Sequence, residues 1–300
     1  MKKYSVGIDV GGTFTKLGLV APDGSVIQSL QIPTEPSKGP AHFTRRAAAI
    51  VKAWNFGSVG LGLAGGVDAK TGSLLFVPNL RGWTGFSFKK AFSKSLGVPV
   101  TVENDANAAV WGGYVVALKK QPHATVIGVT LGTGVGGGLV IEGRLHRGAS
   151  GYAGELGHLT LELDGPRCRC GRRGCLEAYA GTHAILRAAK ARMRRLPSPL
   201  TPKAVAAAAL SGDRGARAVW DEVGTRLGQG LAGLVLVLNP DAILLLGGVA
   251  RAGRLVLDPI RRVFAAQPFR EPFKQVVLSA PAQRDWGVVG AALLSRERRG

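Results

Sequence analysis

Three cysteines lie within eight residues, in the stretch CRCGRRGC from Cys168 to Cys175, and the chain has no other. An odd number of thiols cannot all form intramolecular disulfides, so a metal site is the first candidate. Tetrahedral structural zinc needs a fourth ligand, and His158 stands ten residues before Cys168 in GELGHL. The spacing therefore predicts a zinc site made of three cysteines and one histidine. A redox pair or inert thiols are the alternatives.

Two glycine-rich turns could bind phosphate. They lie in VGIDVGGTFTKLGL from Val6 and in IGVTLGTGVGGGLV from Ile127. Each segment predicts a β-hairpin whose tip exposes backbone N–H groups, and two such tips facing each other would hold a nucleotide. Asp9 could hold Mg²⁺ through water. The candidate nucleotide-binding residues are Asp9, Gly11, Gly12, Thr13, Lys16, Gly132, Thr133 and Gly134.

Asp105 opens a predicted helix, DANAAVWGGYVVAL, directly after the predicted strand VPVTVEN. A carboxylate in the first turn suits the helix dipole. Two roles fit this position: a helix N-cap, or a general base that accepts a proton from a substrate hydroxyl. Capping does not require the preceding Asn104, so the pair favours the catalytic role.

Strands alternate with helices along the chain, which predicts an α/β fold. The two hairpins supply strands near both glycine turns, and the elements between and after them follow from hydrophobic periodicity. We expect strands at 58–64, 98–104, 242–248 and 275–280, and helices at 41–54, after Gly85, at 105–118, 177–196, 202–210, 214–238 and 254–266, and from Trp286 onward.

The chain carries 39 Lys and Arg against 19 Asp and Glu, a formal charge of +20. Such a charge attracts polyanions, but aromatic residues make up only 6% and no nucleic-acid motif is recognisable. We therefore expect a solvated basic surface and no nucleic-acid partner. The aliphatic runs are too short to cross a bilayer, and the N-terminus meets Asp9 before an apolar segment develops, so we expect no membrane association and a cytoplasmic location.

Five motifs in this order resemble the ROK family of sugar kinases and repressors: GIDVGGT, ENDANAA, LGTGVGGG, GELGH with CRCGRRGCLE, and LLGGV. The resemblance spans almost the whole chain. It implies an actin-like ATPase fold of the ribonuclease H-like type, with two α/β domains around a cleft. The implied domains are 1–119, joined by the C-terminal helix at 286–300, and 120–285, which carries the zinc loop.

The resemblance also assigns roles to individual residues. It implies that Asp105 is the catalytic base, that Gly248 lines the nucleotide pocket and that the zinc ligands are His158, Cys168, Cys170 and Cys175. Zinc would then pin the loop that presents part of the sugar site. The implied sugar-binding residues are Gly65, Asn79, Asn104, Asp105, Glu155, His158 and Glu177.

The implied activity is phosphorylation of the 6-hydroxyl of glucose, with ATP, Mg²⁺ and structural Zn²⁺, by a homodimer or homotetramer. Kinases of N-acetylmannosamine, mannose or fructose and a polyphosphate-using glucokinase are alternatives within the enzymes. A sugar-sensing repressor is the alternative outside them. Repressors of the family carry a helix-turn-helix domain before the kinase-like part, whereas the first hairpin here starts at residue 6, which favours the kinase.

Overall fold

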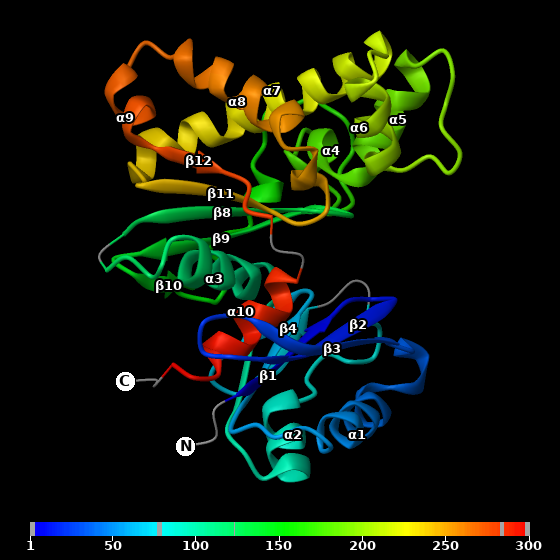
Figure 1. The fold of residues 1–300 in the computed structure, drawn as a ribbon, viewed down its shortest axis with the longest axis vertical. Helices are drawn as coiled ribbons and strands as arrows, with labels where there is room; N and C mark the ends of the chain where they lie inside the picture. The colour runs from blue at the N-terminus through cyan, green and yellow to red at the C-terminus, as the bar shows by residue number, and fades with distance from the viewer. Residues whose placement is uncertain (1–3, 77–79, 123, 283–284, 298–300) are drawn as a thin grey trace. The chain divides into compact units, whose positions relative to one another are not determined.

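The computed structural model describes residues 4–76, 80–122, 124–282 and 285–297, which form two compact units. The first contains the described residues up to Pro122, the segment Gly143–Gly154 and the residues from Asp285 onward, and the second contains the rest. Sheets and helices occur in both, so the expected α/β class is confirmed (Figure 1). The expected domain boundaries stay a prediction, because contacts delimit compact units and do not show independent folding.

The first unit contains the strands β1 (Ser5–Val10), β2 (Phe14–Val20), β3 (Val26–Pro33), β4 (Val59–Leu63), β5 (Gly66–Asp68), β6 (Ser73–Phe76) and β7 (Val100–Asn104). A mixed sheet has the order β3-β2-β1-β4-β7, and β5 pairs separately with β6. β1 and β2 are antiparallel and place Asp9 opposite Lys16, so these two side chains share one face of the sheet. β4 is parallel to both β1 and β7.

The helices of the first unit are the 3₁₀ turn η1 (Pro36–Lys38), α1 (Pro40–Val51), α2 (Phe88–Leu96), α3 (Asp105–Ala117) and α10 (Trp286–Leu294). Glycines let α10 approach its neighbours closely. A Cβ on Gly7 of β1 would lie 1.9 Å from the carbonyl oxygen of Val288, and one on Gly290 would lie 1.6 Å from that of Ala108 in α3. The last helix therefore packs directly on the sheet and on the helix that begins with Asp105.

The second unit contains the strands β8 (Val126–Leu131), β9 (Val135–Ile141), β11 (Ala242–Leu246) and β12 (Val277–Ser279). They form a sheet in the order β9-β8-β11-β12, and β10 (Arg144–His146) follows β9 in the chain. β8 and β9 are the antiparallel hairpin expected around the second glycine turn, and β11 runs parallel to β8 and β12. All five residues of β11 are buried, as an aliphatic strand between two parallel neighbours should be.

The helices of the second unit are η2 (Leu156–His158), α4 (Glu177–Ala180), α5 (Thr182–Arg192), α6 (Pro202–Leu210), α7 (Arg214–Leu238), η3 (Val249–Ala252), α8 (Arg254–Ala265) and α9 (Arg270–Gln275). The prediction of one helix over 177–196 is wrong: Gly181 is extended and separates α4 from α5, because the N–H of Thr182 donates to the carbonyl of Gly132 at 3.0 Å. The predicted 202–210 and 214–238 are confirmed, with Thr201 and Asp213 as their N-caps.

The sequence did not predict β3, β5, β6, β10 or α9. Among the described residues, no helix combines the length and the apolar character that a membrane crossing needs.

Candidate active site and metal centre

Asn104 and Asp105 stand where β7 passes into α3. The side-chain oxygen of Asn104 accepts the N–H of Asn107 at 3.0 Å, and its amide nitrogen donates to the carbonyl of Gly65 at 3.1 Å. Asn104 is therefore the N-cap of α3, and Asp105 is the first helical residue. The Asp105 carboxylate accepts the N–H of Ala106 at 2.9 Å. The capping role considered for Asp105 thus belongs to its neighbour.

Asp9 lies at the end of β1, on the side covered by α10. A Cβ on Gly287 would lie 2.6 Å from its Oδ2 atom, so glycine leaves room for this carboxylate. The pKa of Asp9 is raised to about 7: burial is the largest cause, the charges of Asp105 and Asp285 add to the rise, and Lys16 opposes it. A divalent cation would favour the ionised form of this buried carboxylate, and carboxylate oxygens are ligands that Mg²⁺ prefers, so Asp9 fits the expected role beside Mg²⁺.

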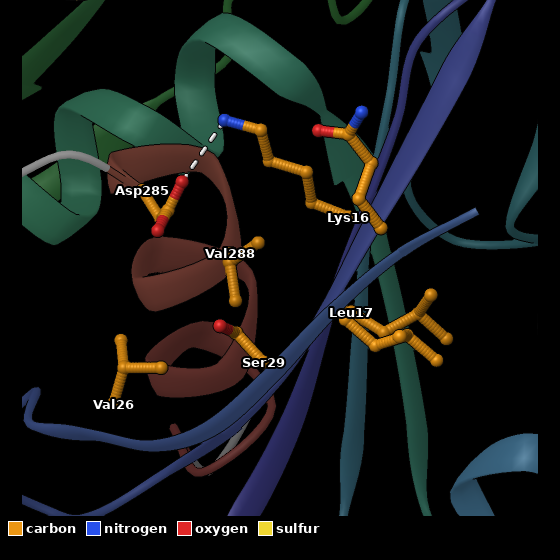
Figure 2. Close-up of a pocket in the computed structure, with 8 residues that line it drawn as sticks. Lys16, Leu17, Val26, Ser29, Asp285 and Val288 are labelled. Atoms are coloured by element: carbon orange, nitrogen blue, oxygen red, sulfur yellow. Dashed lines mark hydrogen bonds and ion pairs between the residues drawn. The ribbon is translucent and has the colours of Figure 1, made fainter. Parts of the chain in front are cut away.

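Lys16 has a carboxylate partner of its own. Its Nζ atom lies 2.9 Å from Oδ1 of Asp285, the residue before α10 (Figure 2). The ion pair lines a pocket of about 270 Å³ whose other walls come from β2, β3 and α10, namely Leu17, Val26, Ser29, Leu30, Gln31 and Val288. A phosphate contact by Lys16 would compete with Asp285, so the predicted nucleotide role of Lys16 requires this pair to open or to share the ammonium.

A threonine holds the first glycine turn in shape. Thr34, which is fully buried, donates its hydroxyl to the carbonyl of Gly11 at 2.7 Å and its N–H to the carbonyl of Thr13 at 2.9 Å. The N–H of Gly11 donates to the carbonyl of Phe14 at 3.1 Å. Thr34 was not predicted from the sequence, because it follows β3, 23 residues after Gly11, and belongs to no recognisable motif.

Glu177 and Thr182 hold the second glycine turn. The N–H of Val135 donates to Oε2 of Glu177 at 3.1 Å, and the hydroxyl of Thr182 donates to the carbonyl of Gly132 at 2.7 Å. A Cβ on Gly134 would lie 2.2 Å from the same Oε2 atom. The absence of a side chain at Gly134 therefore makes room for the Glu177 carboxylate, in addition to any role in letting a phosphate approach the backbone.

The predicted zinc ligands come together. The ligand atoms of His158, Cys168, Cys170 and Cys175 all lie within 4.8 Å of one another. Nδ1 of His158 is 3.7 Å from Sγ of Cys168, and Sγ of Cys170 is 3.7 Å from Sγ of Cys175. A tetrahedron with ligands about 2.3 Å (sulfur) and about 2.0 Å (nitrogen) from zinc has edges of roughly 3.5 to 3.8 Å. The four side chains thus fit one tetrahedral zinc ion.

The thiols differ in acidity. Burial raises the pKa of Cys168 to about 12 and also raises that of Cys175. The pKa of Cys170 is lowered, because hydrogen bonds from the N–H of Arg172 and from the neighbouring thiols outweigh its desolvation. All three are free thiols, which is the form that can bind zinc after losing protons. Metal loading of this site must therefore release protons.

Glu155 and His158 flank the turn η2, which packs tightly on the second hairpin. A Cβ on Gly157 would lie 1.8 Å from the carbonyl oxygen of Val135, so only glycine fits between them. Glu155 is the N-cap residue of η2, and its carbonyl accepts the N–H of His158 at 3.0 Å. Because Nδ1 of His158 faces Cys168, its Nε2 atom lies on the opposite edge of the ring, away from the cysteines.

The remaining predicted residues divide into three cases. Gly65 has a φ of 114°, which only glycine adopts readily, and its carbonyl binds Asn104. Gly248 follows β11 and precedes η3. Asn79 lies outside the described residues. The Asn104–Asp105 junction belongs to the first unit, and Glu155, His158 and Glu177 belong to the second.

Comparison with known proteins defines the class. A model of the ROK family matches residues 5–298, and the chain belongs to this family. A ROK family glucokinase from Streptomyces griseus, solved in complex with glucose and AMPPNP, shares 35% identity and a TM-score of 0.84, over 98% of this chain and 99% of that one. ROK sugar kinases have the actin-like ATPase fold, so the fold expected from the sequence is confirmed.

Two relatives of known activity in the family are glucokinases. The glucokinase of Thermotoga maritima is 34% identical, and that of Streptomyces coelicolor is 36% identical. Each alignment covers 98% of this chain and 98% of the relative. The similarity therefore extends over both compact units.

Proposed function

We propose that this protein is an ATP-dependent hexose kinase that converts glucose to glucose 6-phosphate. The observation that carries the proposal is the similarity to glucokinases over 98% of both chains. The structure of the S. griseus relative contains glucose and the ATP analogue AMPPNP. Asn104 and Asp105 stand at the end of a strand, and most of the residues expected to bind nucleotide lie in or beside glycine turns; ligands of α/β proteins commonly bind at such places.

Asp105 is the group that would accept the proton of the 6-hydroxyl. As the sugar O6 attacks the γ-phosphorus, the bond from O6 to phosphorus forms, the bond from phosphorus to the β,γ-bridging oxygen breaks, and the O6 proton passes to the Asp105 carboxylate. Asn104 uses one N–H on Gly65 and one oxygen lone pair on Asn107, so one N–H and one lone pair remain for a sugar hydroxyl. The base and a substrate ligand thus come from adjacent residues.

The two glycine turns and Asp9 would serve the phosphates. Mg²⁺ bound with ATP supplies positive charge that offsets the phosphate charge during transfer. Asp9 would hold this ion through water, and its ionisation would then be favoured by the cation. The N–H groups of the tips at Gly11–Thr13 and Gly132–Gly134 would bind phosphate oxygens, with Gly248 lining the nucleotide site.

Zinc would have a structural role. The ligand set His158, Cys168, Cys170 and Cys175 fills four positions and leaves none for water. The ion would fix the imidazole with Nε2 free to meet a sugar hydroxyl. It would also fix the loop that leads to Glu177. Glu155 and Glu177 are the carboxylates of this unit that we assign to the remaining sugar hydroxyls.

A coupled assay with MgATP tests the proposal directly. Purified protein is assayed with glucose, mannose, fructose, N-acetylmannosamine and N-acetylglucosamine, and kcat/KM is compared. We expect glucose to give the highest value. A higher kcat/KM for another sugar would identify that sugar as the preferred substrate. Absence of turnover with all five would reject the proposed kinase activity. Light scattering tests the homodimer or homotetramer that the family resemblance favours.

A further inference from the structure

Glu103 is a buried carboxylate directly before the two residues assigned to sugar binding and proton transfer. Only 3% of its surface is exposed. Its Oε2 atom accepts Nε of Arg147 at 2.7 Å. Its Oε1 atom accepts the N–H of Asn104 at 3.1 Å and Nδ2 of Asn107 at 3.3 Å. One carboxylate oxygen of Glu103 therefore binds the junction of β7 and α3, and the other binds the guanidinium that neutralises its charge.

Asn107 depends on this carboxylate for its side-chain position. It is 2% exposed, and its Oδ1 atom has no hydrogen-bond partner among the described residues. Its N–H binds the side chain of Asn104 at 3.0 Å, and its Nδ2 binds Glu103 at 3.3 Å. Residues 103, 104 and 107 thus form a closed hydrogen-bonded ring through the first turn of α3. Asp105 belongs to the turn of chain between Asn104 and Asn107 that these hydrogen bonds hold.

Arg147 connects the same carboxylate to a loop. The N–H of Ala153 donates to the carbonyl of Arg147 at 3.1 Å, which closes residues 147–153 into a loop that belongs to the first unit. Tyr152 in this loop lies against Gly66, where a Cβ would be 2.1 Å from the Tyr152 hydroxyl. The residue before Gly66 is Gly65, whose carbonyl binds Asn104 at 3.1 Å. One end of the loop therefore contacts Glu103, beside Asn104, and the other end contacts Gly66, beside Gly65.

We propose that the buried Glu103–Arg147 ion pair is a positioning device for hexose phosphorylation. Through Oε1 of Glu103 it fixes the junction that carries Asn104 and Asp105. Through Arg147 it docks the loop 147–153, with Tyr152 over Gly66, beside the sugar contact Gly65. Neither Glu103 nor Arg147 is a catalytic residue in this scheme. The proposal rests on the proposed hexose kinase activity.

The ion pair makes two separable predictions because each partner acts on a different segment. Arg147→Met leaves the Glu103 carboxylate buried without its cation, which should disturb the junction and release the loop. Combining Glu103→Gln with Arg147→Met removes both charges, while the glutamine oxygen can still accept from Asn104 and Asn107. In the double variant, the junction of β7 and α3 should therefore regain its wild-type hydrogen bonds, while the loop 147–153 stays undocked.

The experiment measures amide hydrogen exchange in peptides covering 99–110 and 145–156, together with kcat and KM for glucose. For Arg147→Met we expect faster exchange in both peptides, a raised KM for glucose, and a kcat loss of about 30-fold or more, the scale of a misplaced reacting group. In the double variant, kcat should return to within about fivefold of wild type and exchange in 99–110 should return to wild type, while exchange in 145–156 and KM for glucose stay raised.

Arg192→Met is the matched control, since it breaks the ion pair with Glu222 at a side chain of similar exposure, 41% against 35% for Arg147. It should change neither peptide. Wild-type kcat and exchange in Arg147→Met would overturn the proposal, as would a double variant no more active than the single one. If Arg147→Met does not fold, kcat and amide exchange of the double variant alone test the proposal: wild-type exchange in 145–156 would overturn it. A wild-type enzyme that phosphorylates no hexose would reject the proposed function, and unchanged exchange would still reject the positioning device separately.

Discussion

Asn104 and Asp105 show how adjacent residues divide two tasks. Asn104 caps α3 with its side chain and also binds Gly65, whereas Asp105 begins the helix and is not needed as its cap. Because Asp105 does not serve as the cap, its carboxylate can act on a substrate. Its charge also adds to the effect of burial on Asp9, whose pKa is raised to about 7.

Asp105→Asn should lower kcat by about 100-fold or more while KM for glucose changes little, because the amide keeps the shape and cannot accept the O6 proton. The measurement is steady-state kinetics with glucose and MgATP, accompanied by glucose affinity from calorimetry. Turnover equal to wild type would remove Asp105 from the mechanism.

Asp9 should make stability depend on pH. Its pKa is raised from 3.8 to about 7 on folding, so the folded state binds more protons than the unfolded state between these values. The group therefore favours the folded state below pH 4 relative to higher pH, and that contribution is lost as pH rises through 7. Without Mg²⁺ and ATP, Asp9→Asn should raise Tm relative to wild type at pH 8, and the difference should disappear near pH 4. Asp164→Asn, at an exposed position of the second unit, is the control; a pH-independent difference for Asp9→Asn would contradict the burial argument.

At the scale of elements, the second glycine turn is shaped by residues far along the chain. Glu177 at the start of α4 and Thr182 at the start of α5 both bind it, and the break between these helices at Gly181 makes both contacts possible. The zinc loop leads directly into Glu177. The candidate metal site is therefore close to the turn in the chain, since Glu177 follows Cys175 by two residues.

Gly134→Ala should lower Tm, because the added Cβ would lie 2.2 Å from Oε2 of Glu177 and must displace that carboxylate from the N–H of Val135. Gly132→Ala is the matched comparison in the same turn, since nothing lies within 4 Å of its Cβ. Thermal unfolding should show a decrease of several degrees for Gly134→Ala only, the scale of about 1 to 2 kcal/mol. Equal Tm values for the two variants would refute the steric role of Gly134.

Cys170→Ser should remove zinc from a protein that otherwise carries about one ion per chain. Loss of the ion should loosen the segment 155–177, lower thermal stability and weaken glucose binding, while ATP binding to the first hairpin survives. His158→Ala should weaken glucose binding further, because it deletes a metal ligand and a proposed sugar contact together. Elemental analysis, calorimetry with glucose and with ATP, and thermal unfolding measure these effects. Active enzyme without zinc, or unchanged glucose affinity in Cys170→Ser, would contradict this account.

At the scale of the whole molecule, a net charge of +20 raises the question of a polyanionic phosphoryl donor. Residues 165–217 illustrate the excess, with 12 Lys and Arg against Glu177 and Asp213. Some of these arginines bind carbonyls or hydroxyls of their own unit: Arg172 binds Thr160, Arg187 binds Ala178, and Arg217 binds Ala209. Part of the basic surface therefore has a structural role.

MgATP should support turnover with a higher kcat/KM than inorganic polyphosphate, because each glycine turn offers N–H groups for only a few phosphates. The comparison must be made at matched ionic strength, since attraction of a polyanion to a basic surface weakens as salt rises. A higher kcat/KM for polyphosphate under these conditions would make the basic surface a substrate-binding track and would reverse the ranking of donors.

Local pattern was sufficient to predict much of this protein. Short-range signals predict both hairpins around the glycine turns, the helices that begin at Asp105, Pro202 and Arg214, and the group of candidate metal ligands between His158 and Cys175. These signals are β-branched runs, capping residues and ligand spacing. These features depend on residues close together in the chain. Their type and approximate position can therefore be predicted from the local sequence.

Only the tertiary structure decided the contacts between distant segments. Thr34 supports the first turn from another strand, Glu177 reaches the second turn from beyond the zinc loop, and Arg147 neutralises Glu103 across 44 residues of sequence. The same applies to Gly181, whose break in the predicted helix follows from a hydrogen bond to Gly132. Such contacts satisfy buried carboxylates and backbone groups whose partners are fixed by packing. Sequence periodicity cannot reveal them, because it reports which side of an element is buried and not which distant group lies against it.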